Sequence, residues 1–407
     1  MPTLVQINTV VNYTSTGRIA EGIGKAALAA GWRSVIAFGR HPRPSASETI
    51  DLGDRLGTLV HVMATRLADR QGLHSQRATM RLVQSLNRLR PDVIHLHNLH
   101  GYYLDYPLLF RHLRSAGRPV VWSLHDCWPF TGHCCYFDAA GCTRWIDGCH
   151  HCPLVRTYPA SLFVDRSAAN WADKRREFGG MPRLHLVTPS RWLAAQAAGS
   201  FLGHQPCETI PYGIDVDAFR PISDGELLRR YPLQRKHLVL AVASEWDPRK
   251  GLEHVVALRP LLPQDTFDIA IVGVNAKEAS RLTDGIIPIQ RTDSTAELAA
   301  LYSRATVFVN LTLADNFPVT NLEALACGTP VVTYDSGGSP EAIDEGTGVV
   351  VPRGDVAAAA RAIERIAGEN LEAARMRCRE RATAMYRLET QYDRYVSLYR
   401  SLLADAL

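Results

Sequence analysis

Six of the nine cysteines of the chain lie between His125 and Pro153. Four of them follow the spacing C-x7-C-x6-C-x2-C, which suits four thiolates around a tetrahedral zinc ion. These four are Cys134, Cys142, Cys149 and Cys152. The segment opens with His125 and Asp126 directly after an apolar run, so the imidazole is expected at the end of a strand. One short segment therefore combines a candidate metal site with a candidate active-site histidine.

The cysteines allow more than one kind of chemistry. A redox or catalytic role is disfavoured because no thioredoxin-like pattern surrounds the CxxC pair, and an open catalytic zinc more often has histidine and carboxylate ligands. A disulfide framework is disfavoured in a reducing compartment. We favour a closed structural zinc site, with His150 and His151 as substitute ligands. Reduced thiols without a metal remain the alternative.

A basic pair stands in the C-terminal half of the chain. Arg249 and Lys250 follow a strand-like run and precede a glycine and an apolar helix. Two cations at a strand end suit a diphosphate, because arginine can bond two oxygens at once and lysine supplies a point charge. A solvated pair of surface charges is the alternative interpretation.

Two carboxylates stand eight residues apart in the stretch DNFPVTNLE, at Asp315 and Glu323. Asn316, Phe317 and Pro318 are expected in a loop, and Glu323 in the helix that follows it. A carboxylate at this place can accept hydrogen bonds from two ribose hydroxyls, while backbone amides at a helix start can hold the transferring group. The next stretch, SGGSPEAI, is interpreted as a structural turn.

Short apolar runs must position these residues, and they recur between amphipathic stretches like buried parallel strands. The runs begin at Leu4, Ser34, Asp92, Pro119, Leu184, Leu238, Phe267, Thr306 and Thr329. This alternation predicts an α/β fold with two doubly wound, Rossmann-like domains. Such sheets bind ligands at the carboxyl ends of their strands, so the two domains are expected to face a central cleft.

Turn residues cluster between 215 and 236, where we place the domain boundary. The first domain is expected over residues 1–215, with a cysteine-rich insertion at 127–153. The second is expected over 216–385. A C-terminal helix over 386–407 carries aromatic residues on one face, and we expect it to pack back on the first domain.

Bulk properties exclude several classes of protein. The formal net charge of +4 is small for 407 residues and gives no case for nucleic-acid binding. No apolar run reaches the roughly 18 residues that a membrane-spanning helix needs. The N-terminal MPTLVQINTVV is typical of a first strand and lacks the features of a signal peptide. We therefore expect a cytoplasmic protein.

The run DNFPVTNLEALACGTPVV resembles the acid-x7-Glu motif of the retaining glycosyltransferases of family four, which have the GT-B fold. RKG and IPYGID fall where that family has a diphosphate-binding basic pair and a domain-linking turn. The stretch SLHDCWPFTG is similar to a stretch in the first domain of bacterial capsule and exopolysaccharide transferases of the colanic-acid type. The resemblance covers nearly the whole chain. It implies a nucleotide-diphospho-sugar donor, a glycan or lipid-linked acceptor, retention of configuration and no catalytic metal.

The resemblance also assigns roles to single residues. In the second, donor-side domain, Glu323 resembles the ribose ligand, Arg249 and Lys250 the diphosphate ligands, and Asp315 a contact to the donor sugar. The first acid of the pair is usually Glu, so Asp315 departs from the family pattern. The remaining donor contacts implied by the resemblance are Asn316, Phe317, Pro318 and Val319.

In the first, acceptor-side domain, the resemblance gives weight to Gly17 and Arg18 as contacts to the donor phosphates. His97 and Asn98 are expected to meet the acceptor. A histidine in the place of His125 commonly lies near the reacting centre, where it would orient the donor sugar or stabilise developing positive charge. A capped strand-end histidine bonded to its neighbour is the alternative. Related capsule transferases have cysteines in the four places named above, which favours those four over Cys127 and Cys135.

From Val60 to Arg90 the chain is predicted to form an amphipathic helix, in which several arginines oppose a single acid, Asp69. Such a face can rest on an anionic membrane surface, at the inner side of the cell membrane, or it can be a plain solvated face. Two functions other than transfer remain open: a nucleotide-sugar epimerase on the same fold, and a non-catalytic nucleotide or carbohydrate binder.

Overall fold

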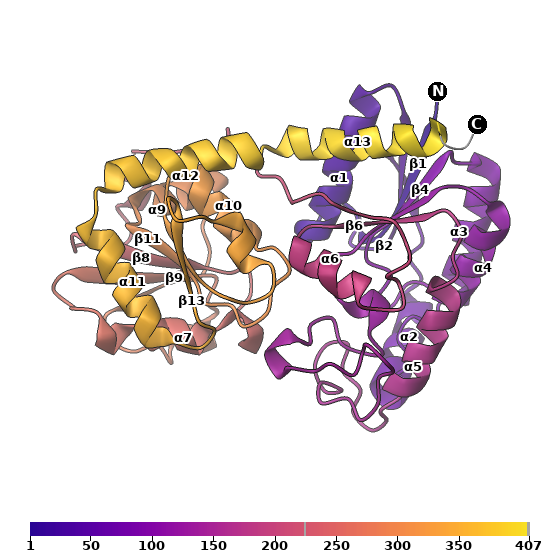
Figure 1. Ribbon diagram of the computed structural model, residues 1–407, viewed down its shortest axis with the longest axis horizontal. Coiled ribbons are helices and arrows are strands. Elements are labelled where there is room, and N and C mark those ends of the chain that lie inside the picture. Colours follow the sequence, from indigo (N-terminus) through magenta and orange to yellow (C-terminus); the bar gives the residue numbers. More distant parts are fainter. Residues whose placement is uncertain (224, 405–407) are drawn as a thin grey trace. The chain divides into compact units, whose positions relative to one another are not determined.

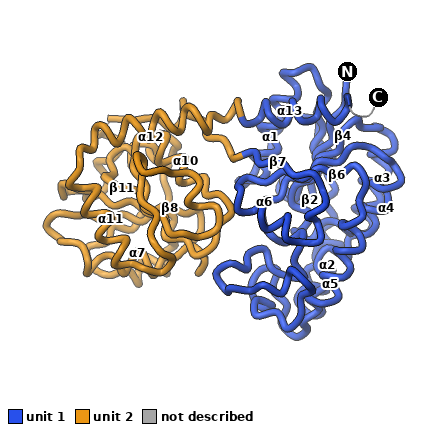
Figure 2. The backbone as a smooth tube through the Cα atoms, in the orientation of Figure 1, with its two compact units in different colours: residues 1–210, 391–407 blue, residues 211–390 orange. Residues whose placement is uncertain are grey.

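The computed structural model describes residues 1–223 and 225–404 of the chain. Figure 2 shows its division into two compact units. Unit 1 comprises Met1–Ile210 and Gln391–Leu407, and unit 2 comprises Pro211–Thr390. Helices and strands alternate in both units, as labelled in Figure 1.

Unit 1 is built on a seven-stranded sheet in the order β3-β2-β1-β4-β5-β6-β7, in which all neighbours are parallel. The strands are β1 Thr3–Val10, β2 Arg33–Arg40, β3 Glu48–Asp51, β4 Val93–Leu96, β5 Val120–Ser123, β6 Leu184–Thr188 and β7 Cys207–Thr209. The order reverses direction at β1. The carboxyl ends of β1, β4 and β5 therefore lie side by side, although two strands and three helices separate β1 from β4 in sequence.

The helices of unit 1 connect these strands. They are α1 Thr14–Ala29, α2 Arg55–Ala68, α3 Gln76–Leu89, α4 Tyr106–Ala116, α5 Ser167–Phe178 and α6 Arg191–Ala198. A last helix, α13 Leu388–Ala404, begins in unit 2 and continues in unit 1. Tyr392 packs against Gly22 of α1, and the hydroxyl of Tyr399 lies 2.6 Å from Nδ1 of His95 on β4. Tyrosines on one face thus tie α13 to the sheet of unit 1.

Unit 2 contains a six-stranded parallel sheet in the order β10-β9-β8-β11-β12-β13. The strands are β8 His237–Val242, β9 Phe267–Val272, β10 Ile286–Ile289, β11 Val307–Asn310, β12 Val331–Tyr334 and β13 Gly348–Val351. The helices are α7 Leu252–Val256, α8 Ala276–Ala279, α9 Thr295–Arg304, α10 Val319–Ala326, α11 Val356–Gly368 and α12 Leu371–Met385. Here the carboxyl ends of β8, β11 and β12 are neighbours.

The predicted α/β class with two doubly wound parallel sheets is confirmed. All nine predicted apolar runs form strands. The four strands that the runs did not predict, β3, β7, β10 and β13, are the edge strands of the two sheets. The strands β3 (ETID) and β7 (CET) are partly exposed and lack the continuous apolar stretch that marks a strand buried on both faces, whereas β10 (IIPI) and β13 (GVVV) are short apolar runs that were not among those predicted.

The single helix predicted from Val60 to Arg90 is wrong in its continuity, because α2 and α3 are separate helices. Asp69 ends α2 in the left-handed conformation, and Gly72 follows at φ +75°. A positive φ at both positions breaks the helix and turns the chain. No helix in the described part of the chain combines the length and hydropathy that crossing a bilayer requires.

Candidate functional site

The predicted donor residues of unit 2 gather at the carboxyl ends of β8 and β11. Arg249 and Lys250 lie in a short 3-10 helix, Pro248–Lys250, after β8, and Asp315 lies in the loop after β11. Nζ of Lys250 is 2.6 Å from Oδ2 of Asp315, and a guanidinium nitrogen of Arg249 is 3.4 Å from the same oxygen. Residues 65 and 66 positions apart in sequence thus form one charged cluster.

Asp315 is ionised in this cluster. Burial opposes its ionisation, but the charges of Lys250 and Arg249 outweigh burial and hold the pKa of the carboxyl below its usual range. Phe317 donates a backbone hydrogen bond to the same carboxyl group. Asp315 is therefore shared by both cations, while Asp247 contacts Arg249 alone at 3.2 Å, and an incoming anion would have to replace Asp315 in part.

Backbone contacts fix the geometry of this cluster. The N–H of Leu313 donates to the carbonyl of Arg249 at 2.7 Å, which joins the loops after β8 and β11. Gly251 has φ +72°, and a Cβ there would stand 2.1 Å from the carbonyl oxygen of Leu311. Only glycine permits this approach, so the glycine of RKG is required for the placement of the basic pair.

Glu323 lies on α10, close to the loop that carries Asp315. The hydroxyl of Tyr302, fully buried on α9, donates to Oε2 of Glu323 at 2.8 Å. Pro318 caps the start of α10 in an extended conformation, and Val319 is its first residue. Phe317 is buried and packs near the ring of Tyr386 at 5.9 Å. Its side chain therefore anchors the loop, and only its backbone remains for a ligand.

The stretch SGGS, interpreted as a turn from the sequence, contacts Asp315 directly. Gly337 has φ +55°, and a Cβ there would lie 1.9 Å from the carbonyl oxygen of Asp315. The N–H of Gly338 donates to that oxygen at 3.0 Å. The hydroxyl oxygens of Ser336 and Ser339 are buried and have no hydrogen-bond partner among the described residues. Unsatisfied buried hydroxyls beside a charged cluster suit a polar ligand. The feature of the sequence that could have drawn attention to these two serines is the Gly-Gly pair between them.

In unit 1, the predicted residues follow β1, β4 and β5. Gly17 is buried within α1, where a Cβ would lie 2.9 Å from a methyl group of Val10, and Arg18 is exposed. Asn98 is half-buried, and its carbonyl accepts a hydrogen bond from the hydroxyl of Tyr103 at 2.8 Å. The sheet order brings these segments together at the carboxyl ends of the neighbouring strands β1, β4 and β5.

His125 belongs to a chain of hydrogen bonds through His97 to Gln6. The amide nitrogen of Gln6 donates to the carbonyl of Ala20 at 2.8 Å, so its oxygen accepts from Nε2 of His97 at 3.0 Å. Nδ1 of His97 is then the acceptor for Nε2–H of His125, also at 3.0 Å. The ring proton of His125 is thereby fixed on Nε2.

Both histidines are neutral near pH 7. Burial is the main cause that lowers the pKa of His125 to about 4, although Asp126 raises it. Burial also lowers the pKa of His97 well below its usual range. His97 is fully enclosed with both ring nitrogens engaged, which leaves it no nitrogen for an acceptor. Sequence reasoning did not identify Gln6, because a single glutamine inside a strand carries no local signal.

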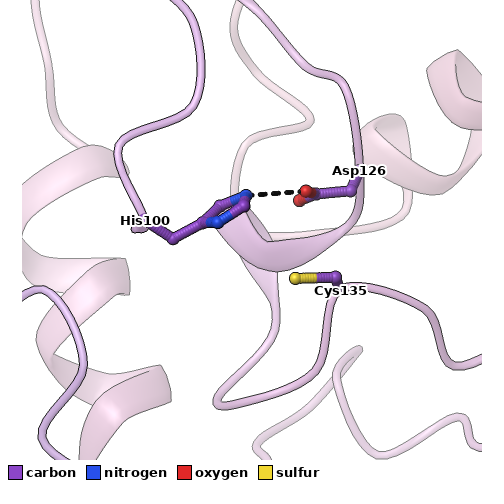
Figure 3. Close-up of side chains that lie close together, drawn as sticks. All are labelled: His100, Asp126 and Cys135. Atoms are coloured by element: carbon purple, nitrogen blue, oxygen red, sulfur yellow. Dashed lines mark hydrogen bonds and ion pairs between the residues drawn. The ribbon is translucent and has the colours of Figure 1, made fainter. Parts of the chain in front are cut away.

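Asp126 is hydrogen-bonded to His100. Figure 3 shows His100, Asp126 and Cys135 converging, and Nε2 of His100 lies 2.7 Å from Oδ2 of Asp126. Among the described residues, this is the group whose potential ligand atoms all lie within 4.8 Å of one another. Tetrahedral zinc holds nitrogen and oxygen ligands roughly 3.3 Å apart. The direct hydrogen bond is shorter than that, so His100 and Asp126 are a buried hydrogen-bonded pair in this arrangement.

The four predicted zinc ligands line one small enclosed hollow, together with Trp145 and Leu154. All nine cysteines of the chain are free thiols. A hydrogen bond between Cys134 and Cys152 lowers the pKa of Cys152 to about 7. The N–H of Gly132 donates to Sγ of Cys149 at 3.1 Å, while burial raises the pKa of this thiol to about 11. Thiols are the donor type that zinc prefers, but among the described residues these four do not form a group whose ligand atoms all lie within 4.8 Å of one another.

Two doubly wound parallel-sheet units with these strand-end residues define the GT-B class of glycosyltransferases, and solved structures share the fold. Sucrose-phosphate synthase from Thermosynechococcus elongatus superposes with a TM-score of 0.71 at 20% identity, over 100% of both chains. Anabaena Alr3699/HepE in complex with UDP gives a TM-score of 0.64 at 16% identity, over 98% of this chain and 100% of that one.

Family models place the chain within this class. The model "Glycosyltransferase Family 4" matches residues 16–218, and "Glycosyl transferases group 1" matches residues 236–369. The chain belongs to these glycosyltransferases. It is 25% identical to the putative colanic acid biosynthesis glycosyl transferase WcaC of Escherichia coli (strain K12), over 98% of this chain and 100% of that protein. It is 29% identical, over 46% of this chain and 54% of that protein, to a GDP-mannose-dependent alpha-(1-6)-phosphatidylinositol monomannoside mannosyltransferase of Mycolicibacterium smegmatis.

Proposed function

We propose that this glycosyltransferase moves a sugar, with retention of configuration, from a nucleotide-diphospho-sugar to a hydroxyl of a glycan or lipid-linked acceptor. We assign it to bacterial surface polysaccharide synthesis, as the name of its colanic acid relative suggests. The observation that carries the proposal is the cluster of Arg249, Lys250 and Asp315 at the strand ends of unit 2. Two cations that share the carboxylate of Asp315 form a site that a diphosphate can enter by exchange.

The donor residues then take separate roles. Arg249 and Lys250 neutralise the diphosphate as it leaves, and Glu323 accepts hydrogen bonds from ribose hydroxyls while Tyr302 orients it. Asp315 contacts the donor sugar. The backbone of residues 316–319 holds the transferring group. A solved structure of the same fold contains UDP, which supports a nucleoside diphosphate as the leaving group.

Unit 1 supplies the remaining roles in this proposal. Gly17 and Arg18 contact the donor phosphates, and Asn98 contacts the acceptor. His125 orients the donor sugar through its fixed tautomer, whereas His97 positions His125 and does not meet the acceptor itself. The protein contributes positioning and electrostatic stabilisation, and no catalytic metal is needed when two cations carry the leaving charge.

The cysteine hollow is proposed to hold a structural zinc ion that braces residues 127–153. Cys134, Cys142, Cys149 and Cys152 would bind it as thiolates, and the ion would fix the loop without taking part in transfer. Elemental analysis of protein purified without chelator tests this. One zinc per chain is expected, and the metal should be lost in Cys149→Ser but kept in the exposed Cys207→Ser control. Metal-free, fully folded protein would contradict it.

A donor panel tests the transfer function. UDP, GDP, ADP and their sugars are compared by thermal shift in wild type and in Glu323→Ala, because a ligand of the folded state raises the melting temperature. One nucleotide should stand out and lose its effect in the variant. Incubation of that donor with and without acceptor then separates transfer from epimerisation and from simple binding. Recovery of epimerised donor, or of unchanged donor, would overturn the proposal.

We further propose a cytoplasmic enzyme that works at the inner membrane surface.

A further inference from the structure

Helix α2 of unit 1 is oriented with its polar side inward. His61 and Thr65 are fully buried, as is Asp69 at its end. The opposite side exposes an apolar stripe, with exposed fractions from 45% to 69%. The stripe consists of Leu56, Leu59, Val60, Met63 and Leu67. A helix on a soluble domain normally buries its apolar side, so this stripe is available for another apolar phase.

Hydrogen bonds hold α2 in this orientation. Nδ1 of His61 lies 2.9 Å from Oγ of Ser75, and Nε2 of His61 accepts the N–H of Gly72 at 2.8 Å. Asp69 lies 2.6 Å from Nδ1 of His133. Rotation of α2 to bury its stripe would leave these buried polar groups unpaired, which is strongly unfavourable. The exposed stripe is therefore a fixed feature of the fold.

A loop distant in sequence extends the apolar surface. Leu162, Phe163 and Val164 are exposed by 50%, 76% and 44%. The N–H of Leu162 donates to the carbonyl of Arg66 in the last turn of α2 at 2.8 Å, so the loop lies beside that end of the stripe. Figure 1 shows α2 at the opposite end of unit 1 from α13. The stripe and this loop form one apolar surface that α13 does not cover.

A cationic hollow borders the stripe. It has a volume of about 1360 Å³, and Leu56 and Met80 line it together with arginines from α2, the loop after α2, α3 and α4. The arginines are Arg55, Arg70, Arg77, Arg81 and Arg111. Two carboxylates also line it, but Asp54 caps α2 and Asp105 caps α4. The hollow therefore presents an excess of positive charge next to an apolar edge.

We propose that this surface docks unit 1 on an anionic lipid bilayer, with the stripe and Phe163 inserted among the acyl chains and the hollow receiving lipid headgroup phosphates. Apolar side chains beside arginines match the layered polarity of a bilayer surface. A second copy of the chain fits poorly, because a symmetric contact would oppose two arginine-rich hollows. The inference names the membrane surface on which the enzyme would meet a lipid-linked acceptor. It rests on the proposed function only for the identity of that acceptor.

The test is sedimentation of the full chain with vesicles of phosphatidylcholine, with and without phosphatidylglycerol. Binding is expected with the anionic vesicles and should weaken in high salt. Arg77→Gln with Arg111→Gln should weaken it by about fivefold for each charge. Leu59→Ser with Met63→Ser should weaken it by more than about tenfold in low and high salt alike. The two sets thus separate headgroup attraction from insertion.

Exposed residues of unit 2 provide matched controls, Arg361→Gln on α11 and Met376→Ser on α12, and both should bind like wild type. Absence of binding to anionic vesicles, or binding that neither set weakens, would overturn the proposal. So would a lipid-free dimer that Leu59→Ser with Met63→Ser converts to monomer, because a second copy would then cover the stripe. Binding is measured without donor or acceptor. Failure of transfer with intact vesicle binding therefore counts against the proposed function alone.

Discussion

In the proposed donor site, Asp315 occupies the cations that a diphosphate would bind, so its replacement by asparagine gives a prediction of unusual sign. Asp315→Asn keeps an oxygen that can accept the backbone hydrogen bond of Phe317 but removes the charge that holds Lys250 at 2.6 Å and Arg249 at 3.4 Å. In wild type, a diphosphate must compete with this carboxylate for both cations. In the variant neither cation is held by residue 315, although Arg249 keeps its contact with Asp247, so UDP or GDP should bind more tightly.

The size of the effect follows from distance and screening. A phosphate oxygen bound to Lys250 would lie roughly 5 Å from the carboxylate, where like charges repel by about 3 kcal/mol at an effective dielectric constant of about 20. The side chain of Lys250 is 27% exposed, so water reduces this repulsion. We expect about 1–2 kcal/mol, which is about five- to thirty-fold tighter nucleotide binding.

Isothermal titration calorimetry with the nucleotide chosen by the donor panel measures this. Transfer should fall in Asp315→Asn even as affinity rises, because the contact to the donor sugar is lost. Asp247→Asn is the matched control: Asp247 lies 3.2 Å from the same guanidinium but is 44% exposed, so little change is expected. If folded Asp315→Asn binds the nucleotide no more tightly than wild type, the exchange of carboxylate for diphosphate is refuted.

Three further predictions concern single contacts. Gln6→Leu removes the oxygen that accepts the Nε2–H of His97 and so holds the ring proton of His97 in place. We expect kcat to fall about tenfold or more with KM nearly unchanged. Equal losses in kcat and KM would contradict a positioning role. Tyr399→Phe leaves Nδ1 of His95 buried without its partner, so urea unfolding of unit 1 should show a loss of about 1–3 kcal/mol. The depressed pKa of Asp315 stabilises the fold above the ordinary carboxyl pKa of 3.8, and this contribution is lost as pH falls through the folded pKa. The stability difference between wild type and Asp315→Asn should therefore shrink in acid, as acid titration monitored by circular dichroism will show.

The sequence by itself determined the strand and helix alternation and the residues at the strand ends. Buried parallel strands are continuous apolar runs, and the nine that were predicted all form. Arg249, Lys250 and Asp315 could be identified because each follows such a run, and a strand end is a local property. The edge strands β3 and β7 carried too little apolar sequence to be recognised.

Only the tertiary structure decided which strand ends meet and which side of a helix is buried. The sheet order sets β1 beside β4 and β5, which joins Gln6, His97 and His125 across more than 110 positions. The pairing of Asp126 with His100 and the contact of Asp69, at the end of α2, with His133 likewise depend on partners outside the local segment. Periodicity reports how one segment alternates between polar and apolar residues. It carries no information on the partner that segment will meet, because that choice depends on the summed packing and hydrogen bonding of the whole unit.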